Sequence, residues 1–446
     1  MSQPIQPVVN PAENKAVVKV NGTANGTPAA PGGGQAAPRI GFWKSLLIVL
    51  SLMGPGLITG NFGNDAGGIT TYSVAGIDFG LSMLWMVIPV VAVLLIYQEM
   101  SGRLGTVTGK GLSDLIREHF GIKSAFYIML GKFLAGIANA ASNIGGIAAA
   151  MMLLKVNKNL AVPLIITFLW IMTIKVNYRR FEKIFLVGIL FYGCYVVAGF
   201  MAPVDWTEVG RQTITPSFQF DSKYLMLVVA LIGTTLAPWM VFYHQSSVVE
   251  KGITIANYKY FRWETLFAGI SVGVVVFFII VTSSCLHHKV HVETAAEVAL
   301  ALQPLGGPDT MYLFAVGLLI ASTGAAIILP LSTSFSVCEI FGWESGVTKR
   351  FSEAPQFYSL FTIQLIIGTI IVLIPGVSLI QIMLLSQTLN GLLLPFVLVI
   401  MLILINKRSV MGRHKQGPFM NVVSIVSTLA ITACAVSLVV SGIIGG

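Results

Sequence analysis

The stretch from Gly54 to Gly80 constrains the fold of this chain most strongly, because a polar, glycine-rich segment interrupts an apolar run. Residues 60–68 contain four glycines, two asparagines and the carboxylate of Asp65. A charge at membrane depth needs a partner, and glycine-rich backbone is tolerated there only inside the protein or beside a watery cavity. A surface loop between two short spans is the alternative, but the apolar flanks at 42–58 and 74–76 favour one interrupted span. We therefore predict a membrane helix broken around Asp65, as secondary transporters build a cation site near the bilayer midplane.

The composition also places the chain in a membrane. Of its 446 residues, 55% are hydrophobic and only 10% are charged, a balance typical of polytopic helical membrane proteins. The net charge of +9 is spread over short loops, so it predicts no nucleic-acid partner. The four cysteines lie in or beside apolar stretches without C-x-x-C spacing, and we interpret them as small buried hydrophobes. We expect a monomer in a lipid bilayer with no bound cofactor.

Eleven membrane spans are predicted from the apolar runs. They cover residues 42–74, 80–101, 124–153, 160–176, 182–203, 223–249, 262–286, 309–341, 357–375, 378–405 and 418–443. The first five and the next five form two sets, and an odd number of spans per set gives the sets opposite topology. We predict a disordered cytoplasmic tail at 1–41, a first repeat at 42–203, a second repeat at 204–405 and an eleventh span within 406–446.

The basic residues predict the orientation of these spans. With the amino terminus in the cytoplasm, 21 Lys and Arg residues fall in cytoplasmic segments and five fall in external loops. Cytoplasmic loops carry the excess of basic residues in membrane proteins. We therefore expect a multi-pass protein of the cell membrane with a cytoplasmic amino terminus and an extracellular carboxyl terminus.

The sixth predicted span repeats the interruption of the first. It contains GTTLAP at 233–238, with apolar residues on both sides. Glycine and proline together break the helical hydrogen-bond ladder and free backbone carbonyls. A proline kink in an ordinary span is the alternative. Interrupted helices at corresponding positions of two inverted halves indicate a substrate site, so we expect spans 1 and 6 to meet there.

Several motifs resemble the Nramp family of divalent-metal transporters. They are GPGL at 54–57, RLGTVTGKGLSDLIREHFG at 103–121, the Ala-Pro break of span 6, QPLGGP at 303–308 and SQTLNGLLLPF at 386–396. The resemblance covers residues 42–415. It implies an all-α membrane protein with a LeuT-type fold, in which two inverted five-helix repeats carry broken first and sixth spans. The apolar pattern predicts the same arrangement.

The departures from the family pattern bear on the substrate. The span-1 signature of the family is Asp-Pro-Gly-Asn, and this chain has Asp65 and Gly68 at its ends. The span-6 signature is Met-Pro-His, and this chain has Ala237 and Trp239 at its ends. The amide and the thioether that bind metal in the family are therefore replaced. This pattern looks like the Nramp-related magnesium transporters, a branch of the family.

The replaced ligands favour a hard cation. A methionine sulfur favours Mn²⁺, Fe²⁺ and Cd²⁺, whereas Mg²⁺ takes oxygen ligands and gives up its waters reluctantly. The expected metal site comprises Asp65, Gly68, Thr234, Ala237 and Gln387. Asp65, the Thr234 carbonyl and Gln387 supply contacts, and the two small residues widen the site for retained waters. The predicted function is alternating-access transport of Mg²⁺, and also Mn²⁺, as substrates.

The sequence predicts uniport without protons. Where the family carries the Asp, Glu and His of its proton route, this chain has Asn139, Ser142 and Trp239, none of which titrates usefully. Glu99 and Glu250 lie near cytoplasmic span ends, where we expect them to pair with arginines. A proton-coupled Mn²⁺/Fe²⁺ importer and a sodium-coupled organic solute symporter remain alternatives. An enzyme is not expected, because the spans contain no H-E-x-x-H motif or nucleophile–base set.

Overall fold

The computed structural model describes residues 63–175, 188–219, 221–255, 258–289, 292, 294–305, 310–347 and 349–444. These residues all belong to one compact unit, Leu52–Gly446. The predicted tail at 1–41, the first half of span 1 and residues 176–187 of span 5 lie outside the described residues.

The described residues form helices and no strand. The helices are α3 (Ala66–Phe79), η1 (Gly80–Met86), α4 (Val87–Thr108), α5 (Leu112–Leu153), α6 (Lys158–Lys175), α8 (Gly188–Met201), α9 (Trp206–Ile214), α10 (Ser222–Thr235), α11 (Pro238–Glu250), α12 (Tyr258–Ser284), α13 (Ala295–Ala299), η2 (Leu300–Leu305), α14 (Thr310–Phe341), α15 (Pro355–Leu373), α16 (Leu379–Asn406), α17 (Arg408–Met411), η4 (Gly412–His414) and α18 (Pro418–Ile444). Within these ranges nine helical segments are long and apolar enough to cross a membrane. The predicted all-α, multi-pass membrane protein is confirmed.

Three predicted boundaries differ from the helix ends of the structure. The sequence places residues 102–123 in a loop, but α4 continues to Thr108 and α5 begins at Leu112. The α5 helix is interrupted at Gly121, whose φ of 79° is accessible mainly to glycine. The last turns of α4 and the first turns of α5 contain many polar residues. A search for apolar runs finds only the membrane-crossing part of a helix, so these turns were not predicted to be helical. Span 2 likewise starts later than predicted, since residues 80–86 form the 3₁₀ helix η1.

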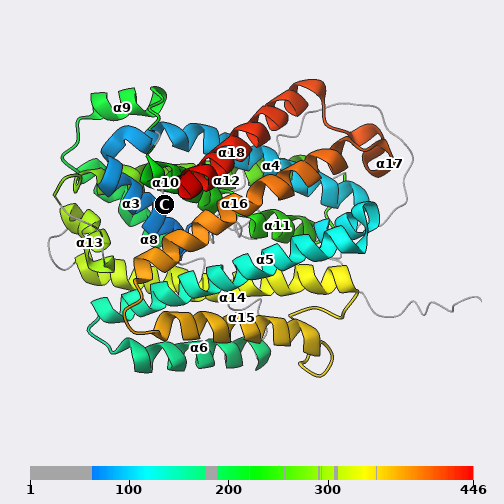
Figure 1. Cartoon of the computed structure of the whole chain (residues 1–446), viewed down its shortest axis with the longest axis horizontal. Coiled ribbons are helices and arrows are strands. Elements are labelled where there is room, and N and C mark those ends of the chain that lie inside the picture. The colour runs from blue at the N-terminus through cyan, green and yellow to red at the C-terminus, as the bar shows by residue number, and fades with distance from the viewer. Residues whose placement is uncertain are drawn as a thin grey trace, which may run out of the picture. The chain divides into compact units, whose positions relative to one another are not determined.

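The α5 helix is central to the packing. It contacts α14, α15, α16 and α3, and α6 packs against both α5 and α15 (Figure 1). The carboxyl-terminal half of α5 is almost entirely buried and consists mainly of alanine, glycine and small polar residues. Small residues let membrane helices approach closely, where van der Waals contact and interhelical hydrogen bonds hold them together. Polar side chains of α5 are thereby brought next to α3 and α16.

Glycines allow four helices to meet at the start of α3. A β-carbon at Gly67 would collide with the side chain of Gln387 on α16, and one at Gly233 of α10 would collide with the Gln387 carbonyl. A β-carbon at Gly146 of α5 would collide with Ala66. Larger residues would push these helices apart, so the glycines determine how closely α3, α5, α10 and α16 approach one another.

Both predicted interruptions lie at this meeting point. The α3 helix begins at Ala66, with Asp65 as its N-cap. The α10 helix ends at Thr235, and α11 begins at Pro238 after the extended residue Ala237. Proline is favoured at the first position of a helix, because the amide it lacks would have no partner there. The break of span 6 is thus confirmed, and the described half of span 1 starts at its expected break.

Candidate functional site

The carboxylate of Asp65 is buried at the amino-terminal end of α3, with 3% of the residue exposed. Its Oδ1 accepts a hydrogen bond of 2.9 Å from the Gly68 backbone N–H, which is a helix N-cap interaction. Its Oδ2 accepts one of 2.8 Å from Asn143 Nδ2 on α5. Gln387 Nε2 on α16 lies 3.5 Å from Oδ1. The positive end of the helix dipole and these donors stabilise an ionised carboxylate at this position.

A buried amide network extends from this carboxylate. Asn143 Oδ1 accepts from the Ala66 N–H at 3.4 Å, and Asn143 Nδ2 also donates to the Asn139 carbonyl at 3.0 Å. Asn390 Nδ2 donates to Asn139 Oδ1 at 2.8 Å and to Gln387 Oε1 at 3.0 Å. The network therefore fixes both side chains that donate to Asp65, and it connects α3 to α5 and α16.

Oxygen atoms surround the bare α-carbon of Gly68. A β-carbon placed there would lie 3.0 Å from the Gly63 carbonyl oxygen, 3.0 Å from Thr234 Oγ1 and 3.6 Å from Asp65 Oδ1. Thr234 is buried and its Oγ1 has no hydrogen-bond partner among the described residues. Such a buried polar atom normally has a partner. The α-carbon of Gly68 thus packs closely against a carbonyl, a hydroxyl and a carboxylate oxygen, and even a β-carbon would be crowded there.

The second break contributes a further oxygen. In a continuous helix the Thr234 carbonyl would accept from the backbone amide four residues later, but that residue is Pro238, which has no N–H. Ala237 is buried and places only a methyl group at this break. The structure brings Asp65, Gly68, Thr234 and Gln387 together, because Gly68 faces Thr234 and Gln387 contacts both Asp65 and α10. Ala237 follows Thr234 at the same break and packs in an apolar cluster with Trp239 and Met240.

The residues around Asp65 are suited to a hard cation that is bound by a single carboxylate. Among the described residues no three His, Cys, Asp or Glu side chains are placed to share a metal ion. Binding would instead use one carboxylate together with neutral carbonyl and hydroxyl oxygens. These are ligands that Mg²⁺ accepts, and Mg²⁺ usually keeps several waters beside one or two carboxylates.

Two residues of the site were missed from the sequence. Asn143 is four residues after Asn139 on an otherwise apolar helix, so the i, i+4 spacing could have indicated a shared polar face. Met240 is buried in the first turn of α11, and its terminal methyl carbon fills the space beside Gly63. The Met240 sulfur is farther away, 3.8 Å from the position of a β-carbon at Gly63. A thioether therefore lies at the edge of the site, with its methyl group toward the break.

Asn139, Ser142 and Trp239 stand where the resemblance places a proton route, and all three side chains are uncharged. Asn139 bonds to Asn390 and accepts from Ser386 Oγ at 2.9 Å. Ser142 is buried and its Oγ has no hydrogen-bond partner in the described part of the chain. The Trp239 carbonyl accepts from Ser332 Oγ at 3.4 Å. No acidic or basic side chain occupies any of the three positions.

Comparison with known proteins gives a family and a fold. The family described as "Nramp: Natural resistance-associated macrophage protein-like" matches residues 56–441. A curated relative, "Divalent metal cation transporter MntH" of Verminephrobacter eiseniae, is 25% identical over 411 residues, which are 87% of this chain and 88% of the relative. A second MntH, from Burkholderia ambifaria, is 24% identical over 90% of this chain and 92% of its own length.

The solved structures share the architecture. A manganese transporter of Eremococcus coleocola superposes with a TM-score of 0.70 at 20% identity, covering 90% of this chain and 88% of that one. MhsT, solved with L-phenylalanine, superposes with a TM-score of 0.54 at 14% identity, covering 86% and 98%. These similarities confirm the predicted LeuT-type fold.

Proposed function

Because this chain belongs to the Nramp family, we propose that it transports divalent metal cations, with Mg²⁺ and also Mn²⁺ as substrates. The family relatives are named for transport of divalent metal cations, and a solved neighbour is named a manganese transporter. The proposed activity is movement of an ion across the bilayer and involves no chemical conversion. The proposed ligands are Asp65, the Thr234 carbonyl and Gln387.

The cluster of oxygens around Gly68 is the observation that supports this proposal. Three oxygens lie within 3.6 Å of the position that a β-carbon of residue 68 would occupy, and one of them, Thr234 Oγ1, has no hydrogen-bond partner among the described residues. Oxygen-only coordination with a single carboxylate favours a hard cation that keeps part of its hydration shell. Ala237 adds room at the second break and offers no sulfur. Mg²⁺ is therefore the preferred substrate, and Mn²⁺ is accepted because it also binds oxygen ligands.

Alternating access provides the route. The proposed site lies between α3 of the first repeat, residues 42–203, and the α10–α11 break of the second, residues 204–405. Asp65, Thr234, Ala237 and Gln387 are each at most 3% exposed, so an ion at this position is enclosed. Movement of one repeat relative to the other would open the site to each side in turn.

Transport is proposed to proceed without protons. Asn139, Ser142 and Trp239 cannot exchange a proton charge near neutral pH. Membrane potential alone suffices as a driving force, since a doubly charged ion gains about 4.6 kcal/mol across 100 mV. With the amino terminus in the cytoplasm, an inside-negative potential would drive uptake into the cell.

Uptake by proteoliposomes tests the substrate class. The full-length chain is reconstituted, a potassium diffusion potential is applied, and entry of Mg²⁺, Mn²⁺ and a labelled amino acid is measured. We expect both metals to enter and the amino acid to remain outside, with Mg²⁺ competing effectively against Mn²⁺. Entry of Mn²⁺ that Mg²⁺ fails to inhibit would support the proton-coupled Mn²⁺/Fe²⁺ alternative. Sodium-dependent entry of the amino acid without metal entry would contradict the proposal.

A further inference from the structure

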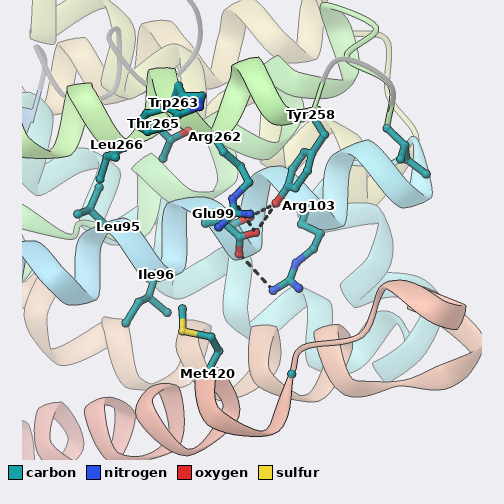
Figure 2. Close-up of a pocket in the computed structure, with 12 residues that line it drawn as sticks. Leu95, Ile96, Glu99, Arg103, Tyr258, Arg262, Trp263, Thr265, Leu266 and Met420 are labelled. Atoms are coloured by element: carbon teal, nitrogen blue, oxygen red, sulfur yellow. Dashed lines mark hydrogen bonds and ion pairs between the residues drawn. The ribbon is translucent and has the colours of Figure 1, made fainter.

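A cavity of about 760 Å³ lies between the carboxyl-terminal half of α4 and the amino-terminal ends of α12 and α18 (Figure 2). Glu99 and Arg103 of α4 and Tyr258 and Arg262 of α12 form its polar part. None of these residues contributes to the proposed transport site. The cavity lies at the end of the helices that carries the excess of basic loop residues.

The polar part of the cavity has one more positive charge than negative charge. Glu99 pairs with Arg103 at 3.2 Å and with Arg262 at 4.0 Å, as expected from the sequence, and also accepts from the Tyr258 hydroxyl. Figure 2 shows both arginines directed toward the same carboxylate from opposite sides. One carboxylate neutralises only one of the two guanidinium groups, so an anion is favoured here.

Arg262 has donors available for that anion, and Arg103 adds its charge beside them. The side chain of Arg103 is 18% exposed and uses one terminal nitrogen for both Gln416 Oε1, at 2.7 Å, and Glu99. The side chain of Arg262 is 63% exposed and reaches Glu99 only at the limit of an ion pair. Guanidinium groups bind phosphate oxygens through two parallel hydrogen bonds, which makes a phosphate group well suited to this position.

The rest of the cavity is apolar and continues onto the outer surface of α12. Leu95 and Ile96 of α4 and Leu266 of α12 line it beside the charged cluster (Figure 2). Trp263, at its rim, is 53% exposed, and one turn further along α12 Phe267 is 61% exposed. Tryptophan is enriched where a membrane meets water. A ligand in this cavity would have its anionic group at the arginines and an apolar part along the exposed face of α12.

We propose that this cavity binds an anionic phospholipid, with its phosphate between Arg103 and Arg262 and its acyl chains along Leu95, Ile96 and Leu266. Basic pockets between membrane helices at the cytoplasmic surface are suited to such headgroups. A soluble phosphate would use the arginines but leave the apolar wall empty. A zwitterionic lipid would fill the wall but would not match the surplus positive charge.

Native mass spectrometry of the full-length chain tests this site. Affinity for the first bound dioleoylphosphatidylglycerol is compared with affinity for dioleoylphosphatidylcholine, which has the same acyl chains. We expect the wild type to prefer the anionic lipid. Arg262→Gln should weaken binding of phosphatidylglycerol about fivefold, the effect of one basic residue at an anionic surface, and leave phosphatidylcholine unchanged. Glu99→Gln should strengthen binding of phosphatidylglycerol, because it removes the competing carboxylate while retaining a hydrogen-bonding group.

Two controls distinguish this site from general surface charge and from a free-anion site. Arg413→Gln changes the same charge on an exposed residue outside the cavity, and should leave the lipid preference intact. Inorganic phosphate should not displace phosphatidylglycerol, because it cannot occupy the apolar wall. Equal losses in Arg262→Gln and Arg413→Gln, displacement by inorganic phosphate, or an unchanged preference in Arg262→Gln would each overturn the proposal. Metal uptake by Arg262→Gln, measured in neutral lipid, confirms that this variant is folded.

Discussion

Asp65 and Lys132 are buried charged side chains in the described membrane-spanning helices, and their surroundings differ. Asp65 lies at the break before α3, and Lys132 lies on α5, the same helix that provides Asn143 to Asp65. They are 3% and 4% exposed, respectively. Charges at this depth are costly, so each must have a compensating environment.

Lys132 has neutral acceptors around it and also interacts with the negative charge of Glu339 on α14. Its Nζ lies 3.4 Å from the Ser332 carbonyl, donates to the Ser336 hydroxyl and sits 4.1 Å from the centre of the Phe242 ring. A carbonyl, a hydroxyl and an aromatic face are all acceptors for an ammonium group.

Asp65 has donors but no cationic partner. No basic side chain in the described part of the chain forms an ion pair with it. A hydroxyl without a hydrogen-bond partner and a backbone carbonyl lie close by instead. The comparison teaches that burial of a charge alone does not identify a transport site. A charge at a helix break, without a cationic partner and beside a hydroxyl that has no hydrogen-bond partner among the described residues, is suited to binding a cation. A charge that interacts with its own neighbours is suited to packing.

Removal of the Asp65 charge should have the largest effect. We expect Asp65→Ala to abolish Mn²⁺ binding and transport of every divalent ion, because it removes the only carboxylate at either break. Calorimetric titration with Mn²⁺ and uptake in proteoliposomes measure this. Asp78→Ala is the matched control, since Asp78 lies on α3 and pairs with Lys223 at 2.9 Å away from the break. Binding of Mn²⁺ to Asp65→Ala with wild-type affinity would remove Asp65 from the site.

Loss of the Asn143 amide should have the next largest effect. Asn143→Leu removes a hydrogen bond of 2.8 Å to the carboxylate and disconnects it from the amide network. A hydrogen bond to a charged group contributes roughly 1.5 kcal/mol or more, so we expect Mn²⁺ affinity to fall about tenfold. Ser142→Ala on the neighbouring residue should have a smaller effect, because the Ser142 hydroxyl has no hydrogen-bond partner in the described part of the chain. Equal affinities for Asn143→Leu and the wild type would show that Asn143 is only a packing residue.

A sulfur at the second break should change selectivity more than it changes activity. We expect Ala237→Met to shift competition uptake from Mg²⁺ toward Mn²⁺ and Cd²⁺, because a thioether favours softer ions. Ala237→Leu is the control of similar volume without sulfur and should reduce transport of all ions alike. Met240→Leu should leave selectivity unchanged, since the methyl group of Met240 is nearer the break than its sulfur. If Met240→Leu lowers the preference for Cd²⁺, the softer ligand is already present and the oxygen-only account is wrong.

Neutralisation of Lys132 should affect stability and spare transport. Lys132→Met keeps the apolar stem but removes the ammonium donor from the Ser332 carbonyl and the Ser336 hydroxyl, which remain bonded to each other. It also removes the contact with the Phe242 ring and the positive charge that interacts with Glu339, so we expect a lower melting temperature in detergent. The ratio of Mg²⁺ to Mn²⁺ uptake should equal that of the wild type. A changed ratio would show that the two buried charges act on the same ion, and the distinction drawn between them would fail.

The breaks were predictable from the sequence because their causes are local. Glycines and a carboxylate within an apolar stretch indicated Asp65, and Gly233 with Pro238 indicated the break between α10 and α11. Only the resemblance to the Nramp family predicted that Thr234 would lie near Gly68 and that Gln387 would lie near Asp65. Close approach depends on the absence of side chains at Gly67 and Gly233, which face residues distant in the chain.

The remaining features depend on contacts between distant residues. Asn143 looks like any polar residue of a membrane helix until α5 is packed against α3. Arg103 and Arg262 lie 159 residues apart in sequence and share Glu99 only because α4 and α12 pack together. The amino-terminal part of α5 was hidden by its polar composition, since hydropathy detects the part of a helix that lies in lipid.

Proton movement during metal entry tests the central claim most directly. Liposomes that contain the protein and an internal pH dye are held at a negative potential with valinomycin and potassium, and Mg²⁺ or Mn²⁺ is added outside. The account predicts metal entry without a pH change beyond that of protein-free vesicles, because Asn139, Ser142 and Trp239 cannot carry a proton charge. Metal-dependent acidification of the vesicle interior would contradict uniport and would require a proton route through groups other than these three residues.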